Sequence, residues 1–119
     1  MTTMRELMSA GIRAQRARLG LLQSDISKRM NDLGFSWYSQ TVGLLERGQR
    51  PLLAEELIAL AVALDCTPEA LYLPPAGTQS VQIGGYAIPA GRLSAVDGTT
   101  SYFGNELRIN PRRQKGRSR

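Results

Sequence analysis

Residues 23–51 decide the fold, and they read QSDISKRMNDLGFSWYSQTVGLLERGQRP. Two short helices are expected in this stretch, over residues 23–33 and 39–47. In each, apolar residues recur every three or four positions, which places them on one helix face: Ile26, Met30 and Leu33 in the first, Val42 and Leu45 in the second. A glycine ends each helix, Gly34 and Gly48, as is common at helix C-termini. Two helices joined by a short turn form the physical pattern of a helix-turn-helix.

Three further helices are expected around this pair. Thr2 or Thr3 caps a helix that runs to about Arg18, and a broad apolar stripe predicts another over residues 54–64. Thr67 followed by Pro68 is typical of a helix start, so a short fifth helix is expected there, ending by Pro74. The sequence thus predicts an all-α domain of five helices over residues 1–75.

The composition changes after this domain. Residues 76–109 contain glycine pairs and short alternating apolar runs without a helical period, which predicts two or three short strands or an extended arm. This segment is too short for a core of its own, so it packs on the helices, pairs with another copy or stays mobile. Residues 110–119 are too charged to fold alone and are expected to form a basic, disordered tail.

Composition excludes several classes of function. The 119 residues contain no histidine and one cysteine, Cys66, which removes the commonest general base, the usual zinc clusters and any internal disulfide. We therefore expect no enzyme activity, no metal and no cofactor. No signal peptide and no membrane span is apparent, and the cytoplasm is the expected location.

The net charge of +5 is distributed unevenly. Residues 1–50 hold eight basic and four acidic residues, residues 51–109 hold two and six, and residues 110–119 hold five basic residues and no acidic one. A basic first half with a basic tail suits an anionic partner, of which nucleic acid is the commonest. The alternative is a solvated surface with an inert tail.

Residues at fixed spacing then carry a resemblance to a known family. They are Ile12-Arg13, Arg16, Gly20-Leu21, Gln23, Ile26-Ser27, Gly34, Val42, Leu45-Glu46-Arg47-Gly48, Arg50-Pro51, Leu57, Leu60-Ala61 and Leu64. In their order and spacing they resemble the Cro/C1-type (Xre) helix-turn-helix family of bacterial and phage repressors, whose fold is lambda-repressor-like. The resemblance covers about residues 6–73. Its most specific part is residues 42–48 followed by Arg50-Pro51.

The resemblance implies roles for individual residues in binding double-stranded DNA. The base-reading positions are Ser39, Gln40, Thr41 and Leu44, and a glutamine such as Gln40 can pair with adenine in the major groove. The implied phosphate contacts are Gln23, Arg47, Gln49 and Arg50. The charge of the tail, and not the resemblance, makes Arg112 and Arg113 candidates for additional phosphate contacts, with a solvated, inert tail as the alternative. Tyr38 is open between a phosphate contact and exposure to solvent. Arg16 and Glu46 match the family's structural ion pair between the first and third helices.

Three positions depart from the family pattern. The turn over residues 33–38 is about two residues longer than usual, so Trp37 is expected in a core position commonly held by valine, and the register of the base-reading residues can shift by one. Leu22 replaces the usual Thr or Ser cap of the second helix. Gln15 replaces a usual leucine in the first helix.

The function implied is a sequence-specific transcriptional regulator, a repressor, that binds a palindromic operator as a homodimer. Its recognition helix enters the major groove. Residues 76–109 are the candidate dimerisation element, because an exposed strand edge invites pairing. The alternative is a monomer in which this arm folds back on the helices. The alternative function is an antitoxin or adaptor whose C-terminal arm binds a partner protein, with DNA binding used for autoregulation.

Overall fold

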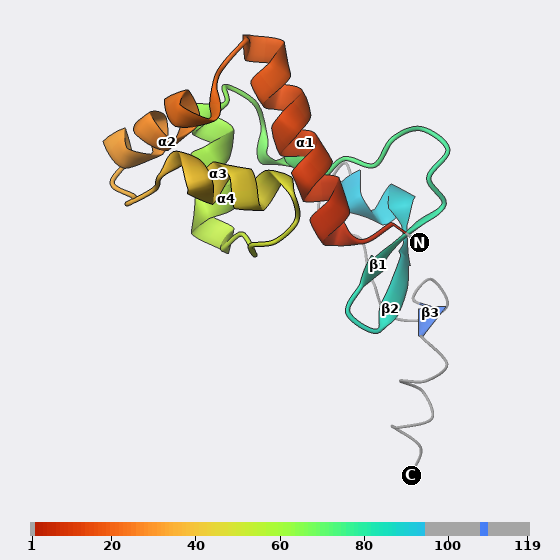
Figure 1. Cartoon of the computed structure of the whole chain (residues 1–119). Coiled ribbons are helices and arrows are strands. Elements are labelled where there is room, and N and C mark those ends of the chain that lie inside the picture. Colours follow the sequence, from red (N-terminus) through yellow and green to blue (C-terminus); the bar gives the residue numbers. More distant parts are fainter. Residues whose placement is uncertain (1, 95–107, 110–119) are drawn as a thin grey trace. The chain divides into compact units, whose positions relative to one another are not determined.

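The computed structural model describes residues 2–94 and 108–109 (Figure 1). The described residues fall into two compact units. One unit, Arg5–Leu73, is helical, and the other combines the start of the chain with the part that follows Pro74.

The helical unit contains four α-helices and a short 3-10 helix (Figure 1). They are α1 (Met4–Leu19), α2 (Gln23–Asp32), α3 (Ser39–Glu46), α4 (Ala54–Ala63) and η1 (Pro68–Leu71). Glycines with positive φ end three of the helices: Gly20 after α1, Gly34 after α2 and Gly48 after α3, with φ angles of 66°, 99° and 70°. These left-handed conformations favour glycine, so the predicted helix ends follow from the sequence.

Helices α2, α3 and α4 begin in the same way. The residues before them, Leu22, Tyr38 and Leu53, have extended backbone and form no side-chain cap. Instead, the side chain of the third helical residue accepts a hydrogen bond from the N–H of the preceding residue. These bonds are Leu22 N to Asp25 Oδ2 at 2.8 Å, Tyr38 N to Thr41 Oγ1 at 3.2 Å and Leu53 N to Glu56 Oε1 at 2.9 Å. Each is half of a reciprocal capping box, which explains why Leu22 replaces a polar cap without loss of the helix.

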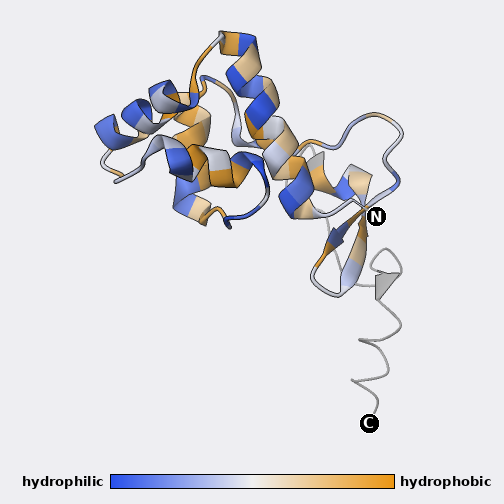
Figure 2. Ribbon diagram, viewed as in Figure 1, coloured by the Kyte–Doolittle hydropathy of each residue, from blue (hydrophilic) through white to orange (hydrophobic). Residues whose placement is uncertain are grey.

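One apolar cluster forms the core of the helical unit. All four α-helices and η1 contribute buried side chains, together with Trp37 from the turn: Ile12, Ile26, Met30, Trp37, Val42, Leu45, Leu60, Ala61, Ala63, Leu64 and Leu71. Helix α2 is hydrophilic over most of its length (Figure 2) and contributes only Ile26 and Met30. Trp37 is 4% exposed, so its predicted place in the core is confirmed.

The second unit contains a small antiparallel sheet of order β1-β2-β3. Strands β1 (Ser80–Ile83) and β2 (Tyr86–Pro89) form a hairpin in which Val81 pairs with Ile88, and β3 (Arg108–Ile109) pairs with the start of β2. Thr3 forms a parallel bridge with Gln82, whose N–H donates to the Thr2 carbonyl at 2.8 Å. A short 3-10 helix, η2 (Ala90–Ser94), follows β2.

One expectation needs correction. The predicted fifth α-helix is a 3-10 helix of four residues, η1, because Pro68 begins it and Tyr72 already leaves the helical conformation. Dimerisation through residues 76–109 stays a prediction. Among the residues described, β1 has a one-residue bridge to Thr3, and β2 pairs with the two-residue strand β3. The predicted basic tail lies outside the described residues.

Candidate nucleic-acid interface

Helix α3 divides its residues between the core and the surface. Val42, Gly43, Leu45 and Glu46 are buried, whereas Gln40 is exposed and Ser39, Thr41 and Leu44 are partly exposed. Gln40 and Leu44 are four residues apart and Thr41 and Leu44 three, so these side chains share one helix face. Three of the four predicted base-reading residues, Gln40, Thr41 and Leu44, therefore lie together on the face opposite the core, and Ser39 lies at the start of the helix beside the buried face.

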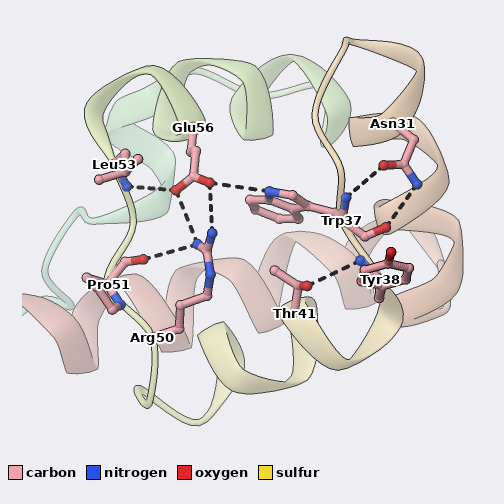
Figure 3. A network of polar contacts seen from close by, with 8 residues as sticks. All are labelled: Asn31, Trp37, Tyr38, Thr41, Arg50, Pro51, Leu53 and Glu56. Carbon is pink, nitrogen blue, oxygen red and sulfur yellow. Dashed lines mark hydrogen bonds and ion pairs between the residues drawn. The ribbon is translucent and has the colours of Figure 1, made fainter.

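The turn before α3 is held by one side chain of α2, which makes two hydrogen bonds to it. The Asn31 side chain bonds both backbone groups of Trp37: Trp37 N donates to Asn31 Oδ1 at 2.7 Å, and Asn31 Nδ2 donates to the Trp37 carbonyl at 2.9 Å (Figure 3). This two-point contact closes the long turn. Tyr38, the next residue, is 71% exposed and precedes the first residue of α3.

A buried carboxylate of α4 lies at the centre of a second network (Figure 3). Glu56 is 5% exposed. Its Oε2 accepts from Arg50 Nη2 at 2.9 Å and from the indole Nε1 of Trp37 at 3.3 Å, and its Oε1 accepts from Arg50 Nη1 at 3.1 Å. The Arg50 guanidinium also lies 5.3 Å from the centre of the Trp37 ring, within the range of a cation–π contact.

Hydrogen bonding shifts the pKa of this carboxyl group. The bonds from Arg50 are the largest cause and lower the pKa of Glu56, while burial opposes them. The Leu53 N–H, the charge of Arg50 and the Trp37 indole N–H lower it further. Glu56 is therefore held in its charged form.

The end of α3 is held by residues of α1 and α2. Arg16 forms a two-point ion pair with Glu46, with Nε–Oε2 at 2.6 Å and Nη2–Oε1 at 2.9 Å, and this bond raises the pKa of Arg16. Gln23 Nε2 donates to Glu46 Oε1 at 3.1 Å. Arg13 donates to the Glu46 carbonyl, and Ser9 donates to the Leu45 carbonyl at 2.9 Å. The pair that the resemblance implies thus lies within a larger set of contacts.

The predicted phosphate-contact residues lie in different environments. Arg47 and Gln49 are exposed just after α3, and Arg47 Nε donates to Gln49 Oε1 at 3.2 Å. Gln23 is partly buried at the start of α2. The Arg50 side chain is 29% exposed. Its guanidinium bonds Glu56 and the Pro51 carbonyl, and in this structure it links the segment after α3 to α4. Arg112 and Arg113 lie outside the described residues.

Sequence reasoning missed four residues that position α3: Ser9, Arg13, Asn31 and Glu56. A glutamate at the third position of a helix is one half of a capping signature, but Leu53 lacks the polar side chain of the other half, so the sequence indicated the role of Glu56 only weakly. Nothing in the sequence pairs Asn31 with Trp37, because that contact depends on the path of the long turn. Among residues 2–94 and 108–109, no cluster of metal-binding side chains and no membrane-spanning helix occurs.

The fold and this arrangement define a helix-turn-helix unit with one polar face of its second helix at the surface. Among solved structures, the chain is similar to the restriction-modification controller protein C.AhdI from Aeromonas hydrophila. The two share 28% sequence identity with a TM-score of 0.51, over 57% of this chain and 91% of the controller. No protein-family model and no curated protein sequence matches the chain. The structural match confirms the resemblance to Cro/C1-type helix-turn-helix regulators.

Proposed function

We propose that the protein is a sequence-specific regulator of transcription that binds double-stranded DNA and acts as a repressor in the cytoplasm. The observation that carries the proposal is the division of α3 between a buried face and the surface face of Gln40, Thr41 and Leu44. The likeness to a restriction-modification controller, which is a regulatory protein, supports it. Repression follows when the bound protein occludes a promoter.

Helix α3 enters the major groove in this proposal. Gln40, the exposed residue of the face, pairs its amide with an adenine edge, while the Thr41 methyl group or Leu44 contacts a thymine methyl group. Ser39 lies at the start of the helix, where its hydroxyl reaches either a base or a phosphate. The Thr41 hydroxyl already accepts a bond from the Tyr38 N–H at 3.2 Å, so the methyl group is its proposed contact.

Phosphate contacts flank this helix. Arg47 and Gln49 are exposed beyond its end, and Tyr38 is exposed before its start. Gln23 lies at the N-terminus of α2, where free N–H groups and the helix dipole favour an anion. Such contacts fix the register of the protein on the duplex without reading its sequence. The tail residues Arg112 and Arg113 add affinity of the same kind.

The operator we propose is palindromic and is bound by a homodimer. A two-fold protein places two copies of α3 in major grooves about one helical turn apart, roughly 34–36 Å. Residues 76–109 remain the proposed source of the dimer contact, through surfaces other than the two strand edges that already carry partners.

The test begins with selection of duplexes from a random pool by the full-length protein. We expect an enriched palindromic sequence, bound about a thousandfold or more tightly than a scrambled duplex of the same composition. The mass of the complex, recorded alongside, gives the number of copies bound. Equal binding of selected and scrambled duplexes contradicts the proposal.

Two glutamine variants test the assignment of base and phosphate contacts. Gln40→Ala weakens binding to the selected duplex by about 1–3 kcal/mol and changes binding to the scrambled duplex little. Gln49→Ala, the matched control, removes the same amide from an exposed position beyond α3 and weakens both duplexes about equally. Similar losses on both duplexes for Gln40→Ala show that this side chain does not read a base.

A further inference from the structure

Helix α3 is too short to hold its own position. It has eight residues, and isolated helices below about 12–15 residues are marginal in water. Its placement therefore depends on the side chains that fix the residues before and after it. The contacts at its C-terminal end come from α1 and α2 and converge on Glu46 and Leu45.

Glu56 of α4 differs from the residues that make these contacts, because it binds one residue that precedes α3 in the sequence and one that follows it. Trp37 lies two residues before the first residue of α3, and Arg50 lies four residues after the last. Both donate to the Glu56 carboxylate, at 3.3 Å and 2.9 Å (Figure 3). Trp37 and Arg50 also contact each other through the indole ring, so the three side chains form a closed group.

A carboxylate is required at this position. Its two oxygens accept four hydrogen bonds: two from Arg50, one from the Trp37 indole and one from the Leu53 N–H. That number matches the acceptor capacity of an ionised carboxylate, whereas a glutamine amide presents donors on one side. In either orientation of the amide, those donors meet a donor of Arg50, together with the donor of Trp37 or of Leu53.

We propose that Glu56 is a positioning residue of α3, which fixes the residues before and after the helix to α4 and so sets the surface that the helix presents. Loss of the carboxylate loosens α3 more than the rest of the helical unit. The consequence for DNA, a selective loss of affinity for the specific duplex, rests on the proposed function. The consequence for α3 itself does not.

Amide hydrogen exchange of the full-length chain tests the proposal without DNA. Glu56→Gln is compared with Glu55→Gln, which makes the same charge change at an exposed position on the same helical turn. We expect exchange of residues 42–47 to accelerate about tenfold or more in Glu56→Gln, as for loss of a hydrogen bond to a charged group. Exchange in α1 changes less, and Glu55→Gln resembles the wild type. Equal acceleration in α1 and α3 overturns the proposal.

Fluorescence and DNA binding give two further readouts. Trp37 is the single tryptophan, so we expect its emission to shift to longer wavelength in Glu56→Gln and not in Glu55→Gln. On DNA, Glu56→Gln loses about tenfold or more of its affinity for the selected duplex and less than about threefold for the scrambled one. If the wild type does not discriminate between the duplexes, the proposed function fails, while exchange still decides the role of Glu56. If the wild type discriminates and Glu56→Gln does so equally, the positioning role is wrong.

A second variant applies if Glu56→Gln does not fold. Trp37→Phe keeps a large ring in the core but removes the indole N–H, and so releases only the residue before α3. We expect exchange of residues 42–47 to accelerate by several-fold relative to α1, since one neutral donor is removed. Unchanged exchange of α3 relative to α1 in this variant overturns the proposal.

Discussion

Glu46 is the residue at which the first three helices meet. It belongs to α3, its carboxylate binds Arg16 of α1 and Gln23 of α2, and its carbonyl accepts from Arg13. Removal of one partner leaves a buried charge uncompensated, which is costly. Glu56 has a comparable place on α4, and it also affects the response of the protein to pH.

Acidification is expected to weaken the fold through Glu56. Its pKa is lowered in the folded protein, so the unfolded chain binds the proton more readily. The stabilisation is fully present above the unfolded pKa of about 4.3 and is lost as the pH falls through the lower folded value. We expect the free energy of unfolding of the wild type to fall more steeply below about pH 5 than that of Glu56→Gln.

Urea unfolding at several pH values, followed by circular dichroism, measures this difference. Glu55→Gln is the control and is expected to keep the slope of the wild type, because Glu55 lies exposed on α4. Parallel pH profiles for the wild type and Glu56→Gln contradict the assignment of the pKa shift to a folded-state contact.

These two glutamates show what could be predicted at the residue scale. The partnership of Arg16 with Glu46 followed from the family resemblance, since its spacing is part of that pattern. The partnership of Glu56 with Trp37 did not, because Trp37 belongs to a turn of unusual length. The surface position of Gln40 followed from helix periodicity, whereas its role in reading bases stays a prediction.

At the scale of elements, the helices support one another at their ends. Helices α3 and α4 have no basic residue in the last turn. Their final carbonyl groups instead accept from arginines of α1 and α2: Arg13 at Glu46, Arg29 at Ala63 and Arg18 at Leu64. Such cations offset the negative end of a helix dipole. The helices could be predicted from periodicity and glycines, but these cross-helix contacts depend on packing.

Helix α1 contains a glycine that packing explains. A Cβ atom at Gly11 would lie 2.1 Å from the carbonyl oxygen of Leu71 in η1. We expect Gly11→Ala to destabilise the protein by about 1–3 kcal/mol, although alanine favours a helix by about 1 kcal/mol over glycine. Thermal or urea unfolding measures the change.

Gly43→Ala in α3 is the matched control. There the added Cβ would meet the end of the flexible Arg47 side chain, 3.2 Å away, rather than backbone. Arg47 is exposed and able to shift, so we expect a change close to zero or a small gain. If Gly11→Ala stabilises the protein, η1 is able to move away from α1 at little cost, and the expected clash with the Leu71 carbonyl does not occur.

At the scale of the whole molecule, basic residues are concentrated in residues 1–50 and 110–119. Residues 110–119 carry five positive charges, which is the whole net charge of the chain. Their removal is expected to flatten the slope of log affinity against log salt on both selected and scrambled duplexes. The slope should change by about 0.9 for each phosphate that the tail neutralises in the wild type.

A chain in which Gly and Ser replace the five basic residues of this tail is the control for length. It should behave like the deletion if charge is the cause. An unchanged slope in both variants would show that the tail does not bind phosphate. Composition predicted this basic segment, but charge alone does not distinguish binding to DNA from a solvated end.

The pairing of residues 2 and 3 with Gln82 has a consequence for biosynthesis. These residues are made before the helical unit, yet their strand partner is made only after every residue of that unit. Domains generally fold as units while synthesis proceeds. We therefore expect the helical unit to fold before residues 2 and 3 pair with Gln82.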